Sequence, residues 1–278
     1  MTFKTILAIS SLDQGSADLL SAAALAERHG AHLKAMLVTF APPPPVGDVG
    51  GIGYVAWGQN WQDDKQRLDE RTATLRSELA ATGASFDVEP VFCLRSSGAG
   101  EIARRAGFAD VTLLGAELML DVGLFRHAID GALFQSPCPV ILAARQTPLT
   151  LAPDRILVAW SPALEAGRAV RQAMDLLSKA RSVLVALVDP QATRAGLGEQ
   201  PGVDIAEYLA RHGVKTTVDL LTSGGRDTGA VLRQHAVDIG AQLIVMGGYG
   251  HSRLRERIFG GVTQSMIDNP QIAVLLAH

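Results

Sequence analysis

Two glycine clusters near the C-terminus are the residues whose type and spacing best suit phosphate binding. The first cluster follows an apolar run at residues 243–246, and the second begins ten residues after the first ends. They consist of Gly247, Gly248 and Gly250, and of Gly260 and Gly261. Glycine lets backbone N–H groups approach an anion because no Cβ intervenes, and a helix N-terminus adds unpaired donors and a favourable dipole. The sequence predicts a polyphosphate between the clusters; the alternative is that these glycines only permit a tight crossover and close helix packing.

Regular elements on both sides must position these glycines. Residues 243–246 have the length and composition of a strand that is buried on both faces. Val262 and Thr263 follow the second cluster at the start of a short helical run, and residues 272–277 form a β-like run that closes the chain. A strand before the glycines and a helix start after them make the pattern more specific than the glycines alone.

The spacing G-x2-G-x9-G, counted from Gly247 to Gly260, resembles the motif G-x2-G-x9-G-[S/T] of the nucleotide-binding members of the universal stress protein family. The chain departs from the motif at Gly261, where the family has Ser or Thr, and Thr263 offers the nearest hydroxyl. It departs again at Ser161, which follows the first strand of the C-terminal half, where those members usually place an Asp. The resemblance implies an adenine nucleotide, ATP or AMP, with Mg²⁺ as a candidate companion.

Ligands of open α/β sheets bind beyond the carboxyl ends of the strands. Val188 and Asp189 end the second strand of the C-terminal half, where the resemblance implies a backbone contact to adenine; the alternative is a plain strand end and turn. His251 and Arg253 lie between the glycine clusters. The guanidinium of Arg253 would offer a planar fork of donors to phosphate oxygens; the alternative is that it lies on a solvated helix face. The predicted nucleotide-binding residues are Ser161, Val188, Asp189, Gly247, Gly250, His251, Arg253, Gly260, Gly261, Val262 and Thr263.

No catalytic residue and no metal ligand is predicted. Ser252 follows His251, but adjacent residues rarely form a nucleophile and base pair, and the sequence identifies no third group that would orient the histidine.

An internal repeat divides the chain into two halves. Residues 4–10 resemble residues 154–161, and an Ala/Leu-rich helical pattern follows each of them. Both halves predict the same order, βαβαβαβαβ. The expected strands are residues 4–10, 33–40, 86–94, 111–115 and 140–143, and residues 154–161, 183–188, 216–221, 243–247 and 273–276. The expected helices are residues 14–29, 63–81 and 100–107, and residues 164–180, 204–212 and 229–240, with a short helix before each last strand.

Strands that alternate with helices predict right-handed crossovers and a parallel sheet covered on both faces. The fold class is α/β, with a parallel five-stranded sheet flanked by helices in each half. The resemblance implies two Rossmann-like domains of the adenine nucleotide alpha hydrolase-like type. Two prolines and the lack of a helical period place the joint at residues 145–153. We therefore expect a degenerate universal stress protein domain at residues 1–146 and a second domain, with the glycine motif, at residues 153–278.

The N-terminal half lacks the glycine motif. Gly115 matches its first glycine, but Leu118 and Arg126 stand at the second and third positions. A phosphate cannot be cradled there in the family manner. Arg126 and His127 either fill the site, contact an anion, or lie on the surface of a degenerate repeat.

A long insertion in the N-terminal half is rich in proline and glycine. Residues 41–53 are expected to form an irregular, partly extended loop. Tyr54, Trp57 and Trp61 follow it and either anchor the loop as a lid or an interface, or simply pack against it.

The composition is that of an ordinary globular protein. Hydrophobic residues make up 47% and charged residues 19% of the 278 residues, and a formal net charge of −3 gives no reason to expect nucleic acid or an acidic membrane as a partner. Cys93 and Cys138 have no metal-ligand spacing nearby and are expected to be buried thiols in a reducing compartment. The sequence shows no secretory signal pattern and no membrane-spanning apolar run, so the cytoplasm is expected.

These observations predict a cytoplasmic tandem universal stress protein that acts in the stress response. Its C-terminal half would bind ATP or AMP as a regulatory, nucleotide-responsive module, with slow ATP hydrolysis as its only catalytic activity, if any. The alternative is a structural or protein-interaction member that binds no nucleotide, and a third hypothesis is a flavin- or nucleotide-using enzyme on a related sheet. The two domains are expected to pair within the chain through their apolar last strands. The alternative is a homodimer that forms through the same strands.

Overall fold

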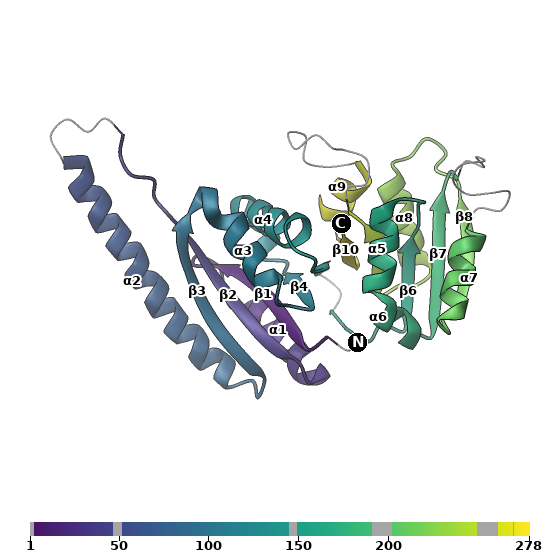
Figure 1. Ribbon diagram of the computed structural model, residues 1–278, viewed down its shortest axis with the longest axis horizontal. Coiled ribbons are helices and arrows are strands. Elements are labelled where there is room, and N and C mark those ends of the chain that lie inside the picture. The colour runs from purple at the N-terminus through teal and green to yellow at the C-terminus, as the bar shows by residue number, and fades with distance from the viewer. Residues whose placement is uncertain (1–2, 47–51, 145–148, 191–201, 249–260, 269) are drawn as a thin grey trace. The chain divides into compact units, whose positions relative to one another are not determined.

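The computed structural model describes residues 3–46, 52–144, 149–190, 202–248, 261–268 and 270–278. The chain forms two compact units, Phe3–Cys138 and Pro139–His278 (Figure 1). Strands and helices alternate along both units. The predicted α/β class is therefore confirmed.

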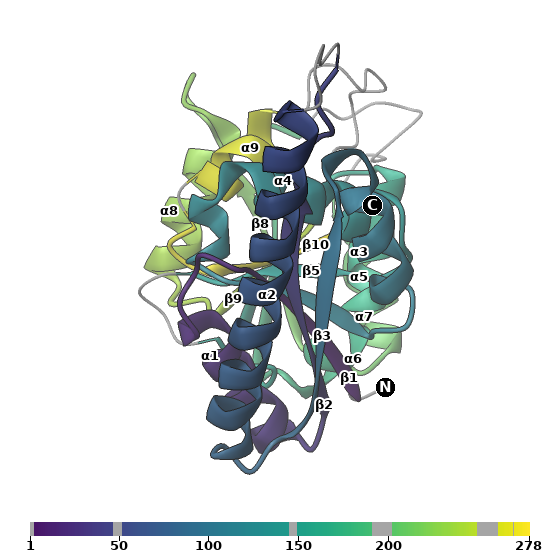
Figure 2. The ribbon, with the colours of Figure 1, turned by 90° about the vertical axis from the view of Figure 1, so that its left-hand side faces the viewer.

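Four parallel strands form the sheet of the N-terminal unit, in the order β3-β2-β1-β4. The strands are β1 (Thr5–Ser11), β2 (His32–Ala41), β3 (Ser85–Leu94) and β4 (Val111–Leu114). The helices are α1 (Ala17–His29), α2 (Ile52–Ala80), α3 (Gly98–Ala106) and α4 (Val122–Ile129), with 3₁₀ turns at Arg95–Ser97 and Leu118–Leu120 and a π-helical turn at Asp130–Phe134. Helix α1 packs against α2, and α3 packs against α4. Figure 2 shows the long α2 running beside β2 and β3.

Six strands form the sheet of the C-terminal unit, in the order β5-β10-β9-β6-β7-β8. They are β5 (Val140–Leu142), β6 (Arg155–Ala159), β7 (Ser182–Val188), β8 (Thr216–Leu221), β9 (Leu243–Gly247) and β10 (Ala273–Ala277). All run parallel except β5, which is antiparallel to β10. The described sheets therefore have four and six strands where five parallel strands were expected in each half, because β5 pairs with β10. The helices are α5 (Leu164–Gln172), α6 (Met174–Lys179), α7 (Val203–Arg211), α8 (Thr228–Asp238) and α9 (Gly261–Asp268).

Burial on both faces explains the apolar strand sequences. Every residue of β4 and every residue of β10 is buried, and so are the first four residues of β9. A parallel sheet with helices on both faces removes both sets of side chains from water, so its central strands read as continuous hydrophobic runs rather than as an alternation. These strands were consequently easy to locate in the sequence.

Helix α2 differs most from the expected elements. It begins at Ile52, whereas a helix from residue 63 was expected, because the aromatic residues belong to the helix itself. The ring of Trp61 packs edge-on against Phe92 at 4.9 Å between centroids, and Trp57 Nε1 donates to the Pro42 carbonyl at 2.9 Å. The two tryptophans thus attach the first turns of α2 to β3 and to the segment after β2. Tyr54 is exposed.

The expected helix at residues 164–180 is two helices. Ala173, at φ −88° and ψ 0°, separates α5 from α6. The other expected elements agree with the observed ones within a few residues at their ends.

In the described part of the chain, Cys93 and Cys138 form no disulfide. Cys138 is buried, and this burial raises the pKa of its thiol to about 11. Cys93 is only partly buried, because it lies on β3, a strand with several exposed positions, so the expectation of a fully buried thiol was wrong there. None of the helices in the described ranges is long and apolar enough to cross a membrane.

Replacing Leu275 in β10 by Ala is expected to lower the free energy of unfolding by about 2–5 kcal/mol, because the side chain is 0% exposed and its loss leaves a cavity. Leu220→Ala on the edge strand β8 is the matched control. Leu220 is 57% exposed, so the expected change is within about 0.5 kcal/mol. Urea titration followed by circular dichroism measures both values, and similar losses for the two variants would contradict the described burial.

Candidate functional site

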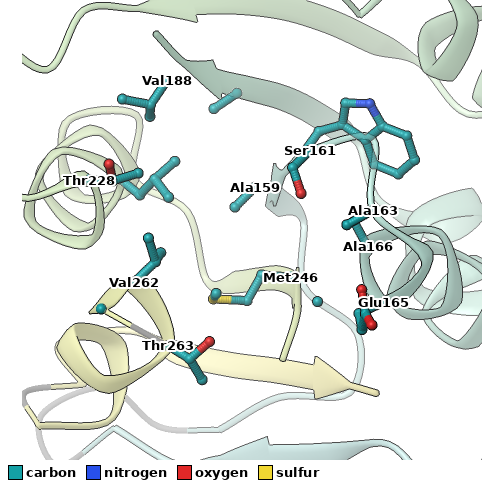
Figure 3. Close-up of a pocket in the computed structure, with 15 residues that line it drawn as sticks. Ala159, Ser161, Ala163, Glu165, Ala166, Val188, Thr228, Met246, Val262 and Thr263 are labelled. Atoms are coloured by element: carbon teal, nitrogen blue, oxygen red, sulfur yellow. The ribbon is translucent and has the colours of Figure 1, made fainter. Parts of the chain in front are cut away.

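A cavity of about 300 Å³ opens at the carboxyl ends of three strands of the C-terminal unit (Figure 3). Ala159, Val188 and Gly247 are the last residues of β6, β7 and β9, and all three line it. The segment between β6 and α5, the first turns of α5 and α9, and Thr228 and Leu232 of α8 also line it. The cavity therefore lies where open α/β sheets bind their ligands.

Six of the predicted nucleotide-binding residues come together in this cavity. They are Ser161, Val188, Gly247, Gly261, Val262 and Thr263. Figure 3 shows Ser161 near the end of β6, Thr228 at the start of α8, and Val262 and Thr263 on α9. Four further predicted residues, Gly250, His251, Arg253 and Gly260, lie outside the described residues.

Asp189 does not line the cavity. It is exposed, its backbone has φ 46°, and its carboxylate accepts a hydrogen bond from the Ser223 N–H at 3.0 Å. Hydrogen bonding by Ser223 lowers the pKa of Asp189. Its visible role is to hold the turn after β8.

The structure adds lining residues that the sequence reasoning did not select. Thr228 begins α8, and Glu165 is the second residue of α5. Both follow a strand end by a few residues, and their positions in the first turns of helices were the signal that could have identified them. The other walls are apolar and include Ala186, Leu232 and Met246.

Close packing of α5 against β9 explains Gly247. A Cβ at this position would lie 2.5 Å from the backbone nitrogen of Ala166 and 2.9 Å from the Cβ of Glu165. The first motif glycine is therefore required by helix packing, whatever the cavity binds. A Cβ at Gly261, by contrast, would meet no atom of the described residues within 4 Å.

A polar network holds α9 on α8. The Ser265 hydroxyl donates to Asp227 Oδ2 at 2.6 Å, and Arg233 donates to the Ser265 hydroxyl at 2.7 Å and to the Ser265 carbonyl. Asp227 also accepts the Ala230 N–H at 2.8 Å as the N-cap of α8. The hydrogen bond from Ser265 is the main reason that the pKa of Asp227 is lowered. The first turn of α9 is thus fixed beside the cavity by contacts one turn further along the helix.

The corresponding place in the N-terminal unit is filled by its own side chains. Asp18, the second residue of α1, accepts the N–H groups of Glu117 and Leu118 at 3.0 Å each, just after β4. Burial raises the pKa of Asp18, and the backbone N–H groups partly offset this effect. The Gln14 amide receives hydrogen bonds from the Ser10 hydroxyl and the Ser11 N–H, and it donates to the Glu117 carbonyl.

Aromatic packing fills the adjoining region of that unit. A Cβ on Gly98 would lie 2.6 Å from the Phe40 ring, which also contacts His127 edge-on at 4.9 Å and carries the Arg95 guanidinium at 4.7 Å from its centroid. Burial first, and then the charge of Arg95, lower the pKa of His127. Of the two residues noted in the sequence, His127 therefore packs into this region and Arg126 is exposed.

No cluster of three or more His, Cys, Asp or Glu side chains that could hold a metal ion occurs in the described part of the chain.

Comparison with known proteins relates this geometry to one family. Residues 153–278 match the sequence model of the Universal stress protein family. A universal stress protein from Archaeoglobus fulgidus DSM 4304 has a similar structure, with a TM-score of 0.65 and 16% identity over 100% of this chain and 96% of that one. A functionally unknown protein from Pseudomonas aeruginosa PAO1 has a TM-score of 0.56 and 16% identity, over 99% of this chain and 92% of that one. Among curated proteins, none matches the sequence. At these identities the structural likeness concerns the fold.

Gly247 and Gly261, one glycine from each cluster, are expected to respond differently to alanine. Gly247→Ala places a methyl group against the α5 backbone and should destabilise the fold by about 1–3 kcal/mol. Gly261→Ala meets no described atom at the start of a helix and should be neutral or stabilising by up to about 1 kcal/mol. Thermal unfolding of both variants measures this difference, and an unchanged Gly247→Ala would show that α5 does not approach β9 as described.

Proposed function

We propose that this chain is a tandem universal stress protein whose C-terminal unit binds an adenine nucleotide, ATP or AMP. We propose domains at residues 1–146 and 153–278 and a cytoplasmic location. One observation carries the proposal of binding. Residues selected from the glycine motif and from the strand ends, spread from Ser161 to Thr263, line a single cavity inside the segment that matches the family model.

The lining suggests how the ligand would lie. A volume of about 300 Å³ is at the lower end of small-molecule pockets and suits a nucleoside with its phosphates extending outward. The apolar side chains of Val188 and Leu232 would pack against adenine, and the hydroxyls of Ser161 and Thr228 would bond to the ribose.

The phosphates would extend toward the N-terminus of α9. A helix start presents unpaired N–H groups and a favourable dipole to an anion, and Gly261, Val262 and Thr263 form that start. Thr263 would take the place of the hydroxyl that Gly261 lacks. The remaining motif residues, Gly250, His251, Arg253 and Gly260, would add donors, and Mg²⁺ would partly neutralise the phosphate charge.

The role that we propose is regulatory. A ligand that touches both α5 and α9 stabilises the conformation in which these two helices flank the cavity. It shifts the conformational equilibrium only by the difference between its affinities for this conformation and for the one in which the helices are apart. Bound nucleotide would thereby change the affinity of the unit's surface for a partner protein. Slow ATP hydrolysis is at most a side activity.

Calorimetric titration of the full chain with ATP or AMP in the presence of Mg²⁺ is expected to give one site per chain. A second site is not expected, because Gln14, Asp18 and Phe40 fill the corresponding place in the N-terminal unit. Ala159→Leu places a larger apolar side chain in the cavity and should weaken binding at least about tenfold, which corresponds to about 1.4 kcal/mol.

Ala210→Leu is the matched control for this titration. Ala210 is exposed on α7 and does not line the cavity, so the substitution should leave affinity unchanged. Absence of binding in the folded parent protein would overturn nucleotide binding and favour a structural or interaction role. Binding that survives Ala159→Leu would place the nucleotide elsewhere.

A further inference from the structure

The described wall of the cavity contains one ionisable side chain, the carboxylate of Glu165. The other fourteen lining residues are neutral, and their polar side chains are the hydroxyls of Ser161, Thr228 and Thr263 and the indole of Trp160. No lysine, arginine or histidine from the described ranges lines the cavity. A ligand therefore meets a negative charge there with no described cation beside it.

Packing fixes the position of Glu165. It is the second residue of α5, is half-buried, and has its Cβ against the end of β9, where only a glycine fits at position 247. Figure 3 shows Glu165 on the α5 side of the cavity and Val262 and Thr263 on the α9 side. Its carboxylate makes no ion pair with the residues that the structure describes. The charge is thus held near the first motif glycine and remains open to the cavity.

The N-terminal unit shows what a carboxylate does at the equivalent place. Asp18 is likewise the second residue of the helix after the first strand, and a Cβ on Gly115 would collide with its carboxylate. This carboxylate accepts the N–H groups of Glu117 and Leu118, which follow β4. An acidic residue from the first turn of a helix thus lies against the glycine at the end of the corresponding strand in both units, and in the N-terminal unit its carboxylate accepts the backbone N–H groups that follow the strand.

We propose that Glu165 determines which adenine compounds the cavity accepts, favouring those with few phosphate charges, adenosine and AMP, over metal-free ATP. This inference rests on the proposed nucleotide site. A carboxylate repels each phosphate charge brought near Gly247, whereas it does not repel a neutral nucleoside and can accept a hydrogen bond from a ribose hydroxyl. Repulsion from a half-exposed group is screened by salt, so the preference depends on ionic strength.

Glu165→Gln removes the charge and keeps the size of the side chain, so it tests the inference without disturbing the packing of α5. Parent and variant are titrated calorimetrically with adenosine, AMP and ATP in EDTA, at low and at raised salt. The variant is expected to gain affinity for ATP relative to adenosine by about fivefold, the factor for two unit charges about 4 Å apart in water. AMP should gain less, and raised salt should shrink the difference.

Glu207→Gln on α7 is the matched control. Glu207 is exposed, pairs with Arg211 at 2.9 Å and does not line the cavity, so its loss should leave the order of affinities unchanged. Equal changes for all three ligands in Glu165→Gln, or no change, would overturn the role of Glu165 while leaving nucleotide binding intact. If neither the folded parent nor the folded variant binds any of the three, the nucleotide site itself is refuted and this inference with it.

Discussion

The fold depends on burying apolar parallel strands on both faces. A strand such as β10, whose five residues are all buried, is stable only when helices cover both sides of its sheet. Because the crossovers between strands return each strand in the same direction, the carboxyl ends of all parallel strands lie at one edge of the sheet. The ends of β6, β7 and β9 meet there for this reason, and the cavity lies among them.

The two units use the same junction differently. In both, an acidic residue in the first turn of a helix lies against a glycine at or just after the end of a strand, Asp18 against Gly115 and Glu165 against Gly247. Asp18 accepts hydrogen bonds from the backbone N–H groups after β4, and Phe40 fills the space beside Gly98. In the N-terminal unit, side chains of the unit itself therefore fill the place that corresponds to the cavity. In the C-terminal unit, by contrast, a cavity remains at the ends of β6, β7 and β9.

Helix α9 is held in place by polar contacts at Ser265 as well as by its buried apolar side chains, Met266 and Ile267. The Ser265 hydroxyl lies between the Asp227 carboxylate and the Arg233 guanidinium, both of which belong to the start and middle of α8. Hydrogen bonds to charged groups are directional and are stronger than those between neutral groups. They therefore fix the orientation of α9 as well as its distance from α8. These contacts connect α9, whose first turn lines the cavity, to α8.

The sequence by itself determined the repeat, the α/β class and most of the strands, because strands buried on both faces leave continuous apolar runs that need no tertiary information to recognise. It also brought Ser161, Val188 and Thr263 into one predicted site, since the carboxyl ends of parallel strands share an edge. Only the tertiary structure decided that Gly247 is required for helix packing, that Asp189 does not line the cavity, and that Glu165 does. Each of these depends on how closely a helix approaches a strand end, and that distance is set by side chains far apart in the sequence.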